Sequence, residues 1–594
     1  MEIWFNNINF ILIFVVFALS LNLLLGYAGQ VSVAHAAFGA VGGYAMGNLA
    51  MAHHWNFVPG VLLGMLVSLV FGIAVALCAL KLSVEYIILL TLAMSSVILG
   101  VFTTFKQLGG SYGLIGIPVP NLFGWKMLRP RDWVLPLLGV AIIVYVFCWR
   151  IGESPFGRVL KGIREDDRAT EALGKSVFHY KVTVFAIASM LAGLAGGLYS
   201  SYIHLATPGV YGFAISLTIF AMVIFGGMAN LTGSVLGAIV VQASQPVLER
   251  VIKLSPEKVG FVRLIIYGIM LVVLMLLRPQ GVLPEGFSLW GRLRRVRGDT
   301  GRLEMVKDAM PPSVSLANIT MTERLDEPTH EQQEAKEQAW KSSPGVLEVR
   351  GLTKRFGGII AAEDLDMDLH KGTITALVGP NGAGKTTVFN LLTGFIKPDH
   401  GSIKLNGTQL VGEVPNEVAR QGMVRSFQDV RLFMRLSCLQ NVAMAVQNQP
   451  GEHLRPLFFN GKAADRTELA TRDKALEWLK FVGMEQFAHV PAGALSYGQS
   501  KLVALARVLA TDADVLLLDE PASGIDTQWV EAMLALIESL RDQGRTICIV
   551  EHNLHVVGRL ADHTYFMELG RITAQGTVEE LTTSPRLAAA YFGT

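Results

Sequence analysis

The stretch that decides the fold of the second half of the chain reads Ile374-Thr-Ala-Leu-Val-Gly-Pro-Asn-Gly-Ala-Gly-Lys-Thr-Thr387. Strand-forming residues, Ile374–Val378, lead into a glycine-rich loop that ends in Lys385 and Thr386. In such a loop the glycines let backbone N–H groups surround phosphate oxygens, the lysine reaches the outer phosphates, and the threonine hydroxyl binds Mg²⁺. A helix that begins directly after the loop adds its positive end. The stretch therefore predicts an α/β domain that binds a nucleoside triphosphate.

A second stretch, Val515-Leu-Leu-Leu-Asp-Glu520, predicts a buried strand that ends in two acids. Parallel sheets bind their ligands at the carboxyl ends of the strands. We therefore expect Asp519 to lie near the metal ion and Glu520 to polarise the attacking water. The acidic pair alone is a weak signal, and it becomes a strong one because Leu495-Ser-Tyr-Gly-Gln499 precedes it.

The first half of the chain has a different composition. No Asp, Glu, Lys or Arg occurs from Ile3 to Leu80, whereas a water-facing surface needs charge. A helix that crosses a bilayer needs ~20 apolar residues. The apolar runs are Ile8–Gly26, Val33–Ala52, Val58–Leu80, Val84–Phe105, Trp133–Trp149, Thr183–Tyr202, Leu217–Val241 and Val259–Leu277. They predict a polytopic helical bundle of eight to ten spans, in which frequent Gly and Ser allow close helix packing.

Positive charge predicts the orientation of the spans. Basic residues cluster from Arg150 to Lys181 and again at Arg292–Arg297, and both clusters should be cytoplasmic. An even number of spans must then separate them, although only three apolar runs do. We therefore expect Leu217–Leu248 to contain two shorter spans, broken near Gly226–Gly233.

The cytoplasmic loop Ser154–Tyr180 combines two helical pieces that have apolar faces with dense charge. This pattern suits a surface that docks on a soluble domain, and a solvated charged loop is the alternative. The candidate coupling residues are Arg164, Glu165 and Glu171.

Four polar residues lie in the first two spans: Asn22, Gln30, Ser32 and His35. Polar groups inside a membrane are costly and often functional. They could line a substrate path, or they could form hydrogen bonds between helices. The sequence leaves both interpretations open for each residue.

The domain organisation follows from these composition changes. Residues 1–285 form the predicted membrane domain, residues 286–345 a charged linker, and residues 346–594 the nucleotide-binding domain. The linker has few large apolar residues, and it contains one candidate short helix near Glu331–Trp340. The four cysteines show no metal-ligand spacing and are expected to be reduced.

Residues Val346–Thr594 resemble the nucleotide-binding domain of ABC transporters, because the markers of that family occur in the family's order. The resemblance implies ATP and Mg²⁺ as ligands. The ATP-binding residues that it implies are Phe356, Gly379, Pro380, Asn381, Gly382, Ala383, Gly384, Lys385, Thr386, Thr387, Ser496, Gly498 and Gln499. The other implied roles are catalytic for Glu520, His552 and Gln428, metal-binding for Thr386, Asp519 and Gln428, and dimer contact for Ser523 and Asp526.

One residue departs from the pattern of that family. Tyr497 stands where the signature motif usually has a glycine. Ser496 and Gly498, which contact the γ-phosphate of the opposite nucleotide in the family, are both present. The departure therefore does not imply loss of activity, and Tyr is familiar here in the branched-chain amino acid branch.

The membrane half resembles the permease family of that same branch. The similar stretches are Leu19–Phe38, Gly109-Gly-Ser-Tyr-Gly-Leu, Ser154-Pro-Phe-Gly-Arg, Ile163-Arg-Glu-Asp and Leu277-Arg-Pro-Gln-Gly. The chain thus resembles a fusion of permease and ATPase subunits. Relatives in this family also carry urea and short amides, so the resemblance predicts the type of transporter more firmly than its substrate.

The resemblance implies an importer in the bacterial inner membrane whose ATPase domain is cytoplasmic. It also implies partners: a second permease and a second ATPase (or a second copy of this chain), an extracytoplasmic substrate-binding protein, and a small amino acid or amide as substrate. It implies no nucleic acid. An ABC exporter is disfavoured because the cytoplasmic loops are short. A membrane-anchored soluble ATPase regulator is disfavoured because there is one phosphate loop, and a kinase because of the signature motif.

Overall fold

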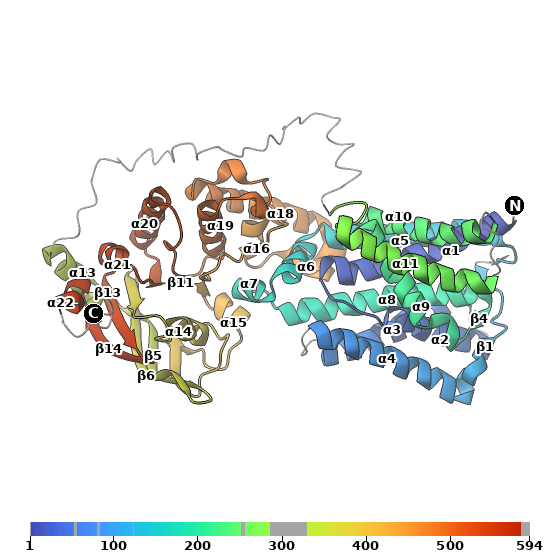
Figure 1. Ribbon diagram of the computed structural model, residues 1–594, viewed down its shortest axis with the longest axis horizontal. Coiled ribbons are helices and arrows are strands. Elements are labelled where there is room, and N and C mark those ends of the chain that lie inside the picture. Colours follow the sequence, from blue (N-terminus) through green and yellow to red (C-terminus); the bar gives the residue numbers. More distant parts are fainter. Residues whose placement is uncertain are drawn as a thin grey trace. The chain divides into compact units, whose positions relative to one another are not determined.

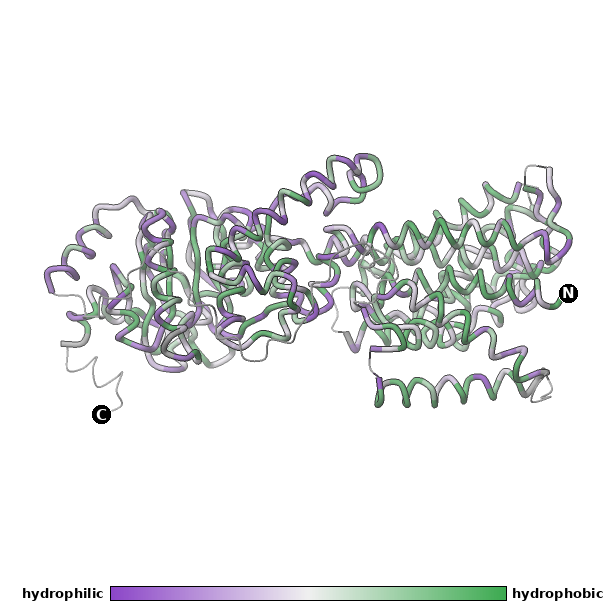
Figure 2. The backbone as a smooth tube through the Cα atoms, turned by 90° about the horizontal axis from the view of Figure 1, so that it is seen from above, coloured by the Kyte–Doolittle hydropathy of each residue, from purple (hydrophilic) through white to green (hydrophobic). Residues whose placement is uncertain are grey.

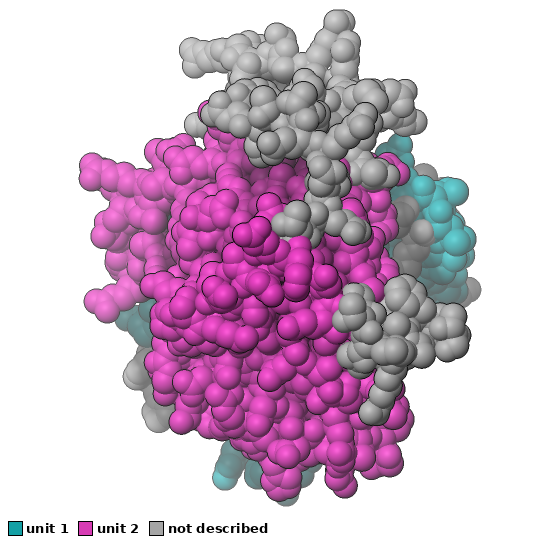
Figure 3. All heavy atoms as spheres, turned by 90° about the vertical axis from the view of Figure 1, so that its left-hand side faces the viewer, with its two compact units in different colours: residues 1–164, 177–304 teal, residues 165–176, 305–594 magenta. Residues whose placement is uncertain are grey.

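The structure is a computed structural model that describes residues 2–52, 56–79, 84–122, 124–250, 256–278, 280–285 and 330–583. It divides into two compact units, coloured separately in Figure 3. The membrane unit contains Met1–Arg164 and Val177–Glu304, and the cassette unit contains Glu165–Ser176 and Met305–Thr594. Residues 286–329 of the predicted linker lie outside the described residues.

The membrane unit is a bundle of long helices (Figure 1). Their bounds are α1 Glu2–Asn22, η1 Leu23–Tyr27, α2 His35–Ala52, α3 Phe57–Ala79, α4 Val84–Thr104, α5 Pro130–Gly152, α6 Pro155–Glu165, α8 Val177–Ile203, α9 Phe213–Gly226, α10 Leu231–Arg250 and α11 Pro256–Leu277. Each predicted apolar run contains helix, and Figure 2 shows the apolar character of these helices. Among the described residues, seven helices are long and apolar enough to cross a membrane. The exact number of spans stays a prediction, because α2 is not among the seven and the apolar part of α11 is shorter.

The predicted break in the seventh apolar run is confirmed. Helix α9 ends at Gly226 and α10 begins at Leu231. A Cβ atom on Gly226 would lie 2.0 Å from the carbonyl oxygen of Gly233, so only glycine allows the two helices to approach this closely. Four helices, α8 to α11, therefore follow the first basic cluster in the sequence, and three of them are long and apolar enough to span a membrane. The even number of spans stays a prediction.

Short elements connect the long helices of this unit. They are η2 Lys106–Leu108, η3 Gly110–Tyr112, β1 Leu114–Ile115, β2 Asn121–Leu122, β3 Trp125–Lys126, β4 Leu205–Ala206 and η4 Pro208–Tyr211. Strand β1 pairs antiparallel with β4, and β2 pairs with β3. These pairings give partners to backbone groups that would otherwise be unsatisfied at the end of an apolar bundle.

Helices α2 and α8 pack through glycine, as the abundance of small residues predicted. A Cβ atom on Gly42 would lie 2.2 Å from the carbonyl oxygen of Gly193, and one on Gly196 would lie 1.9 Å from that of Gly39. Small residues let backbones approach where lipid provides no hydrophobic driving force. The two helices therefore touch along their backbones.

Asn22 has a structural role in the bundle. Its Nδ2 donates to the Asn230 carbonyl at 3.0 Å and to Ser234 Oγ at 2.7 Å, and its Oδ1 accepts from the Ala229 N–H at 2.9 Å. The side chain is fully buried. For this residue the hydrogen-bonding interpretation holds, because Asn22 joins the end of α1 to the turn between α9 and α10.

The cassette unit is built on two sheets. Their strands are β5 Gly345–Phe356, β6 Ile359–His370, β7 Ile374–Val378, β8 His400–Leu405, β9 Thr408–Gln409, β10 Met423–Arg425, β11 Val515–Asp519, β12 Thr546–Val550, β13 His563–Glu568 and β14 Arg571–Gly576. The six-stranded sheet has the order β10-β11-β12-β7-β13-β14, parallel except at β14. The antiparallel sheet has the order β6-β5-β8-β9. The parallel order places the carboxyl ends of β7, β11 and β12 along one edge.

The cassette unit also contains helices, most of which are labelled in Figure 1. Their bounds are α7 Asp167–Ala172, α13 His330–Ser342, α14 Lys385–Leu392, α15 Pro415–Arg420, α16 Cys438–Ala445, η5 Pro450–Glu452, α17 Leu454–Phe459, α18 Gly461–Phe481, η6 Glu485–Phe487, η7 Ala492–Ala494, α19 Tyr497–Leu509, α20 Thr527–Asp542, α21 Leu554–Leu560 and α22 Val578–Thr583. The four cysteines of the chain are unpaired, as expected.

Helix α13 confirms the short helix predicted near Glu331–Trp340, and it is anchored to the cassette. The Trp340 ring stacks on the His563 ring with centroids 3.9 Å apart and lies 4.1 Å from the His370 ring. A Glu337 carboxylate oxygen lies 2.9 Å from His563 Nδ1. The cassette unit therefore holds the last part of the predicted linker as a packed element.

We expect Asn22→Leu to lower the free energy of unfolding by about 1–2 kcal/mol, because it leaves buried partners unsatisfied while keeping the side-chain size. The measurement is the midpoint of thermal unfolding of the full chain in detergent. Ser96→Ala is the control, since Ser96 is exposed and bonds only within its own helix, to the Leu92 carbonyl. An unchanged midpoint for Asn22→Leu would contradict the structural role.

Candidate functional site

The glycine-rich loop lies between β7 and α14 at the carboxyl edge of the parallel sheet. Gly379 and Gly384 have φ angles of +151° and +109°. Cβ atoms at these two positions would lie 2.0 Å from the Met567 carbonyl oxygen and 2.2 Å from that of Ala361. Only glycine fits such contacts, so the backbone of the loop is held in one path.

Lys385 begins α14 and reaches back across this loop. Its Nζ donates to the Gly379 carbonyl at 2.7 Å and to the Pro380 carbonyl at 3.0 Å. Burial lowers the pKa of this lysine, while the carboxylates of Glu520 and Asp519 act in the opposite direction. Asn381, Gly382 and Ala383 lie in the loop, and Thr386 and Thr387 lie in the first turn of α14. The ammonium group is therefore held at the mouth of the loop.

Asp519 ends β11 and forms an ion pair with Arg425, which sequence reasoning missed. Arg425 Nη2 lies 3.1 Å from Asp519 Oδ2, and the two side chains are 2% and 1% exposed. Arg425 also donates to Asn390 Oδ1 at 2.6 Å, and its guanidinium lies 4.7 Å from the centre of the Phe427 ring. Burial lowers the pKa of Arg425 to about 10 and raises that of Asp519. Asp519 Oδ1 is buried without a partner, so one oxygen is anchored and the other is unengaged.

The three predicted catalytic residues come together at Glu520. Gln428 Nε2 donates to Glu520 Oε2 at 3.0 Å, and His552 Nδ1 lies 3.9 Å from Glu520 Oε1. Glu520 has a φ angle of +48°, and its N–H donates to the Val550 carbonyl at 2.9 Å. A non-glycine residue in the left-handed region is often found at functional sites. Lys501, a second missed residue, donates from Nζ to the Glu520 carbonyl at 2.5 Å.

The signature residues form the start of α19. Ser496 caps this helix: its hydroxyl accepts from the Gln499 N–H, and the Ser496 N–H donates to Gln499 Oε1 at 2.9 Å. A Cβ atom on Gly498 would lie 3.0 Å from the Trp529 ring. The helix therefore presents its N-terminus with a fixed cap, and that end of a helix favours anions.

Tyr497, the departure from the usual signature, packs within its own chain. A Cβ atom on Gly524 would lie 3.2 Å from the Tyr497 ring, and Lys501 Nζ lies 5.6 Å from the ring centre. Gly524 belongs to the predicted dimer loop. The tyrosine thus fills space between this loop and Lys501, and it leaves the cap at Ser496 intact.

The remaining predicted residues lie at the surface of the cassette unit. Phe356 ends β5 with 44% of its area exposed, and Lys354 Nζ lies 5.5 Å from its ring. The Ser523 N–H donates to the Glu520 carbonyl at 3.3 Å, and Asp526 precedes α20 as its N-cap residue. The first residue of the predicted dimer loop, Ser523, is therefore hydrogen-bonded to the backbone of Glu520, the catalytic candidate.

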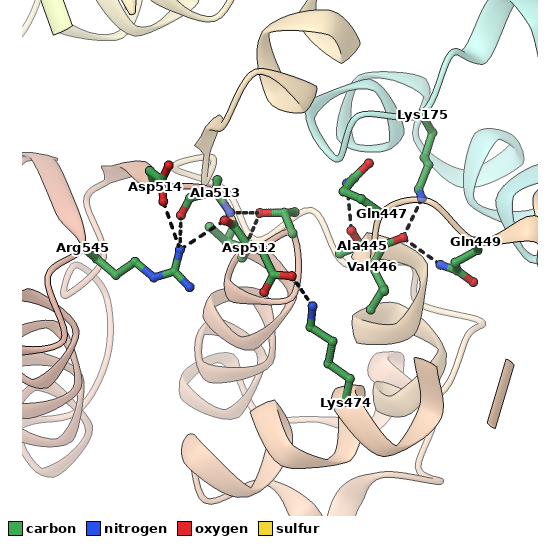
Figure 4. Close-up of polar contacts among 12 residues, drawn as sticks. Lys175, Ala445, Val446, Gln447, Gln449, Lys474, Asp512, Ala513, Asp514 and Arg545 are labelled. Carbon is green, nitrogen blue, oxygen red and sulfur yellow. Dashed lines mark hydrogen bonds and ion pairs between the residues drawn. The ribbon is translucent and has the colours of Figure 1, made fainter. Parts of the chain in front are cut away.

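The segment Glu165–Ser176, which we call the docking segment, belongs to the cassette unit although the membrane helices α6 and α8 flank it. The N-cap of α7, Asp166, lies 2.9 Å from Arg431 Nη1. Lys175 is almost fully buried, and its Nζ donates to the Val446 carbonyl at 2.8 Å (Figure 4). The same Nζ donates to Glu452 Oε1 at 2.7 Å. Two ion pairs thus hold the segment in the cassette unit. The segment supplies the acid in Asp166–Arg431 and the base in Lys175–Glu452.

Backbone carbonyls of the docking segment are also bound. Gln447 Nε2 donates to the Leu173 carbonyl at 2.7 Å, and Arg420 Nε donates to that of Gly174 at 3.0 Å. The predicted coupling residues Glu165, Glu171 and Arg164 do not share one environment. Glu165 accepts from the Arg435 N–H at 3.3 Å, and Glu171 lies in α7.

Arg164, the third predicted coupling residue, belongs to the membrane unit. Its guanidinium donates to Glu285 Oε2 at 2.7 Å and to the Gly26 carbonyl at 2.6 Å. Lys175 was missed by sequence reasoning, because nothing in the loop distinguishes a buried lysine from its solvated neighbours.

Comparison with known proteins assigns a family to each half. Residues 3–275 match the family model of the branched-chain amino acid transport system permease component. Residues 362–523 match the family model of the ABC transporter.

Individual relatives match the cassette half. The high-affinity branched-chain amino acid transport ATP-binding protein BraF of Pseudomonas aeruginosa is 37% identical over 249 residues, which cover 42% of this chain and 98% of BraF. The corresponding protein LivG of Escherichia coli is 36% identical over 252 residues, with 42% and 99% covered. A crystal structure of a nucleotide-free ATP-binding cassette from an ABC transporter is 30% identical, with a TM-score of 0.38, and covers 42% of this chain and 100% of its own. The chain is a multi-pass membrane protein that belongs to the branched-chain amino acid transport family of ABC transporters, and it joins the permease component and the ATP-hydrolysing cassette in one polypeptide.

Proposed function

We propose that this chain imports branched-chain or other hydrophobic amino acids across the bacterial inner membrane and uses ATP hydrolysis in its cytoplasmic cassette as the driving force. Residues 1–285 serve as the permease, 286–345 as the linker and 346–594 as the cassette. The observation that carries the proposal is the docking segment, which is part of the permease sequence but is bound within the cassette unit through Lys175 and Glu452.

The carboxylate of Glu520 activates the attacking water in this proposal. Gln428 orients it through a hydrogen bond of 3.0 Å, and His552 contacts the γ-phosphate. The loop residues Gly379–Thr387 wrap the phosphates, and the exposed ring of Phe356 stacks on adenine. Catalysis of this kind rests on positioning and electrostatics.

The residues fit a Mg²⁺ ion. Asp519 Oδ1 is buried without a partner while Oδ2 is held by Arg425, and hard cations prefer oxygen ligands of this kind. Asp519, the Thr386 hydroxyl and the Gln428 amide oxygen would hold the ion. When bound, Mg²⁺ neutralises negative charge on the phosphates.

In this proposal the chain needs partners to form a complete transporter. One chain supplies one phosphate loop and one signature motif, and the signature residues Ser496, Gly498 and Gln499 cap the nucleotide of a second cassette. Ser523 and Asp526 contact that second cassette. A second permease and a second ATPase, or a second copy of the chain, complete the assembly, and an extracytoplasmic binding protein delivers the substrate.

Uptake assays test the substrate and the direction. Right-side-out vesicles should accumulate labelled leucine in an ATP-dependent way, whereas inverted vesicles should not. Accumulation in inverted vesicles alone would identify an exporter, and accumulation of urea without leucine would identify an amide importer.

Glu520→Gln should abolish ATP turnover while ATP binding persists, because the amide keeps the shape of the side chain but cannot act as a base. Turnover and binding of labelled ATP are measured on the same preparation. Full hydrolysis by this variant would remove Glu520 from its proposed role.

Arg425→Leu should lower the free energy of unfolding by about 3–5 kcal/mol, because it leaves the Asp519 charge buried without its partner. The pKa of Asp519, already raised by burial, should rise further. The carboxylate would then be ionised only at higher pH, so the acid limb of the Mg²⁺-dependent ATPase profile should move upward. Arg472→Leu, which breaks an exposed ion pair with Glu468, is the control and should move neither the midpoint nor the profile.

Lys175→Glu should reduce leucine uptake at least tenfold while ATP hydrolysis continues, because it places two carboxylates together in a buried contact. The double variant Lys175→Glu, Glu452→Lys should recover part of the uptake. Lys474→Glu is the control, since Lys474 pairs with the exposed Asp512 elsewhere in the cassette unit (Figure 4). Normal uptake by the single Lys175 variant would exclude the docking segment from coupling.

A further inference from the structure

The membrane unit contains a break between its first two long helices. Helix α1 and η1 end at Tyr27 and α2 begins at His35, while Ala28–Ala34 form neither helix nor strand. Irregular backbone at membrane depth is tolerated only where protein covers it or where it lines a cavity. In transporters such breaks are typical of binding sites.

The start of α2 lies inside the bundle, among three other helices. His35 Nε2 lies 2.6 Å from Ser20 Oγ of α1, and the Ala36 N–H donates to Ser216 Oγ of α9 at 3.1 Å. The Val33 N–H donates to Thr91 Oγ1 of α4 at 3.2 Å. Along the helix, Ser20 lies about 10 Å before the end of η1, at ~1.5 Å per residue. Because His35 contacts Ser20, the positive N-terminal end of α2 lies at the same depth, inside the bundle.

Polar side-chain atoms without partners gather in this break. They are Gln30 Nε2, Gln30 Oε1, Ser32 Oγ and His35 Nδ1. Gln30, Ser32 and His35 are 5%, 2% and 0% exposed. No other stretch of this length in the described part of the chain holds as many unpaired buried atoms. Asn7 Nδ2, Asn9 Oδ1 and Tyr44 Oη also lack partners in the described part of the bundle, whereas Asn22, equally buried, has all its hydrogen bonds.

The tautomer of His35 follows from its neighbour. The Ser20 hydroxyl already donates to the Phe17 carbonyl at 2.8 Å, so at His35 it accepts, and His35 Nε2 carries the proton. His35 Nδ1 is then an acceptor. The break thus offers one acceptor at His35, amide donors and an acceptor at Gln30, and a hydroxyl at Ser32.

We propose that Gln30, Ser32, His35 and the N-terminus of α2 bind the polar end of the transported substrate. A carboxylate or carbonyl oxygen is bound by the Gln30 amide, the Ser32 hydroxyl and the positive helix end, while an N–H of the ligand donates to His35 Nδ1. Gln30, Ser32 and His35 supply an amide, a hydroxyl and an acceptor nitrogen, which suit a ligand that carries both an acceptor oxygen and an N–H group. A neutral α-amino acid and a short amide share this chemistry. The inference rests on the proposed import function and names the site within it.

Two variants of the full chain, produced with its partners, test the site: Gln30→Leu and Ser32→Ala. Leucine should raise the unfolding midpoint of the unchanged chain, and both variants should lose that shift and raise the KM for leucine uptake at least tenfold. Their midpoints without ligand should stay or rise, because an unpaired buried polar group is removed. Asn22→Leu is the matched control, and its midpoint should fall.

Each outcome has a distinct meaning. Midpoints that fall as in Asn22→Leu, with the leucine shift retained, would assign these residues to the structure alone and overturn the inference. Leucine uptake by the unchanged chain with an unchanged KM in both variants would overturn the inference and leave the import function intact. A shift with urea in place of leucine would assign the site to amides. If the unchanged chain imported neither leucine nor urea, the import proposal would be wrong, and the inference that rests on it would be wrong as well.

Discussion

A polar or charged group buried away from water must find a partner, and this constraint determines how both units of the chain are built. In the membrane unit it explains why Asn22 is bound on every side. In the cassette unit it explains why Asp519 and Lys175, both nearly inaccessible, each have an oppositely charged neighbour within 3.1 Å. Buried ion pairs of this kind contribute less to net stability than to a unique arrangement, because desolvation offsets most of their attraction.

The exceptions to the constraint then become informative. Asp519 Oδ1 in the cassette and the atoms of Gln30, Ser32 and His35 in the bundle are buried without partners. At two of these residues a neighbouring contact fixes the side chain while leaving one atom unengaged: Arg425 holds the other oxygen of Asp519, and Ser20 holds the other nitrogen of His35. Fixed groups with one unengaged atom are preorganised for a ligand, because little conformational entropy is lost on binding.

The sequence predicted what depends on local chemistry and composition. The phosphate loop was predictable because glycine, lysine and threonine act at fixed spacing, and the break at Gly226 because charge orientation required an extra helix there. The partners Arg425 and Lys175 were not predictable, because burial of one side chain depends on contacts far away in sequence. Lys175 and Glu452 are separated by 277 positions. Asn22 and Gln30 look alike in the sequence, and only the packing of α9 and α10 around Asn22 distinguishes them.

Chain continuity connects the two kinds of site. Only Ser176 separates Lys175, which the cassette unit holds through Val446 and Glu452, from Val177, the first residue of α8. Within the membrane unit, helix α8 touches α2 backbone to backbone at the pairs Gly42–Gly193 and Gly39–Gly196. Such contacts contain no flexible side chain. Because α2 begins at His35, they connect α8 to the helix whose first residue belongs to the proposed substrate site.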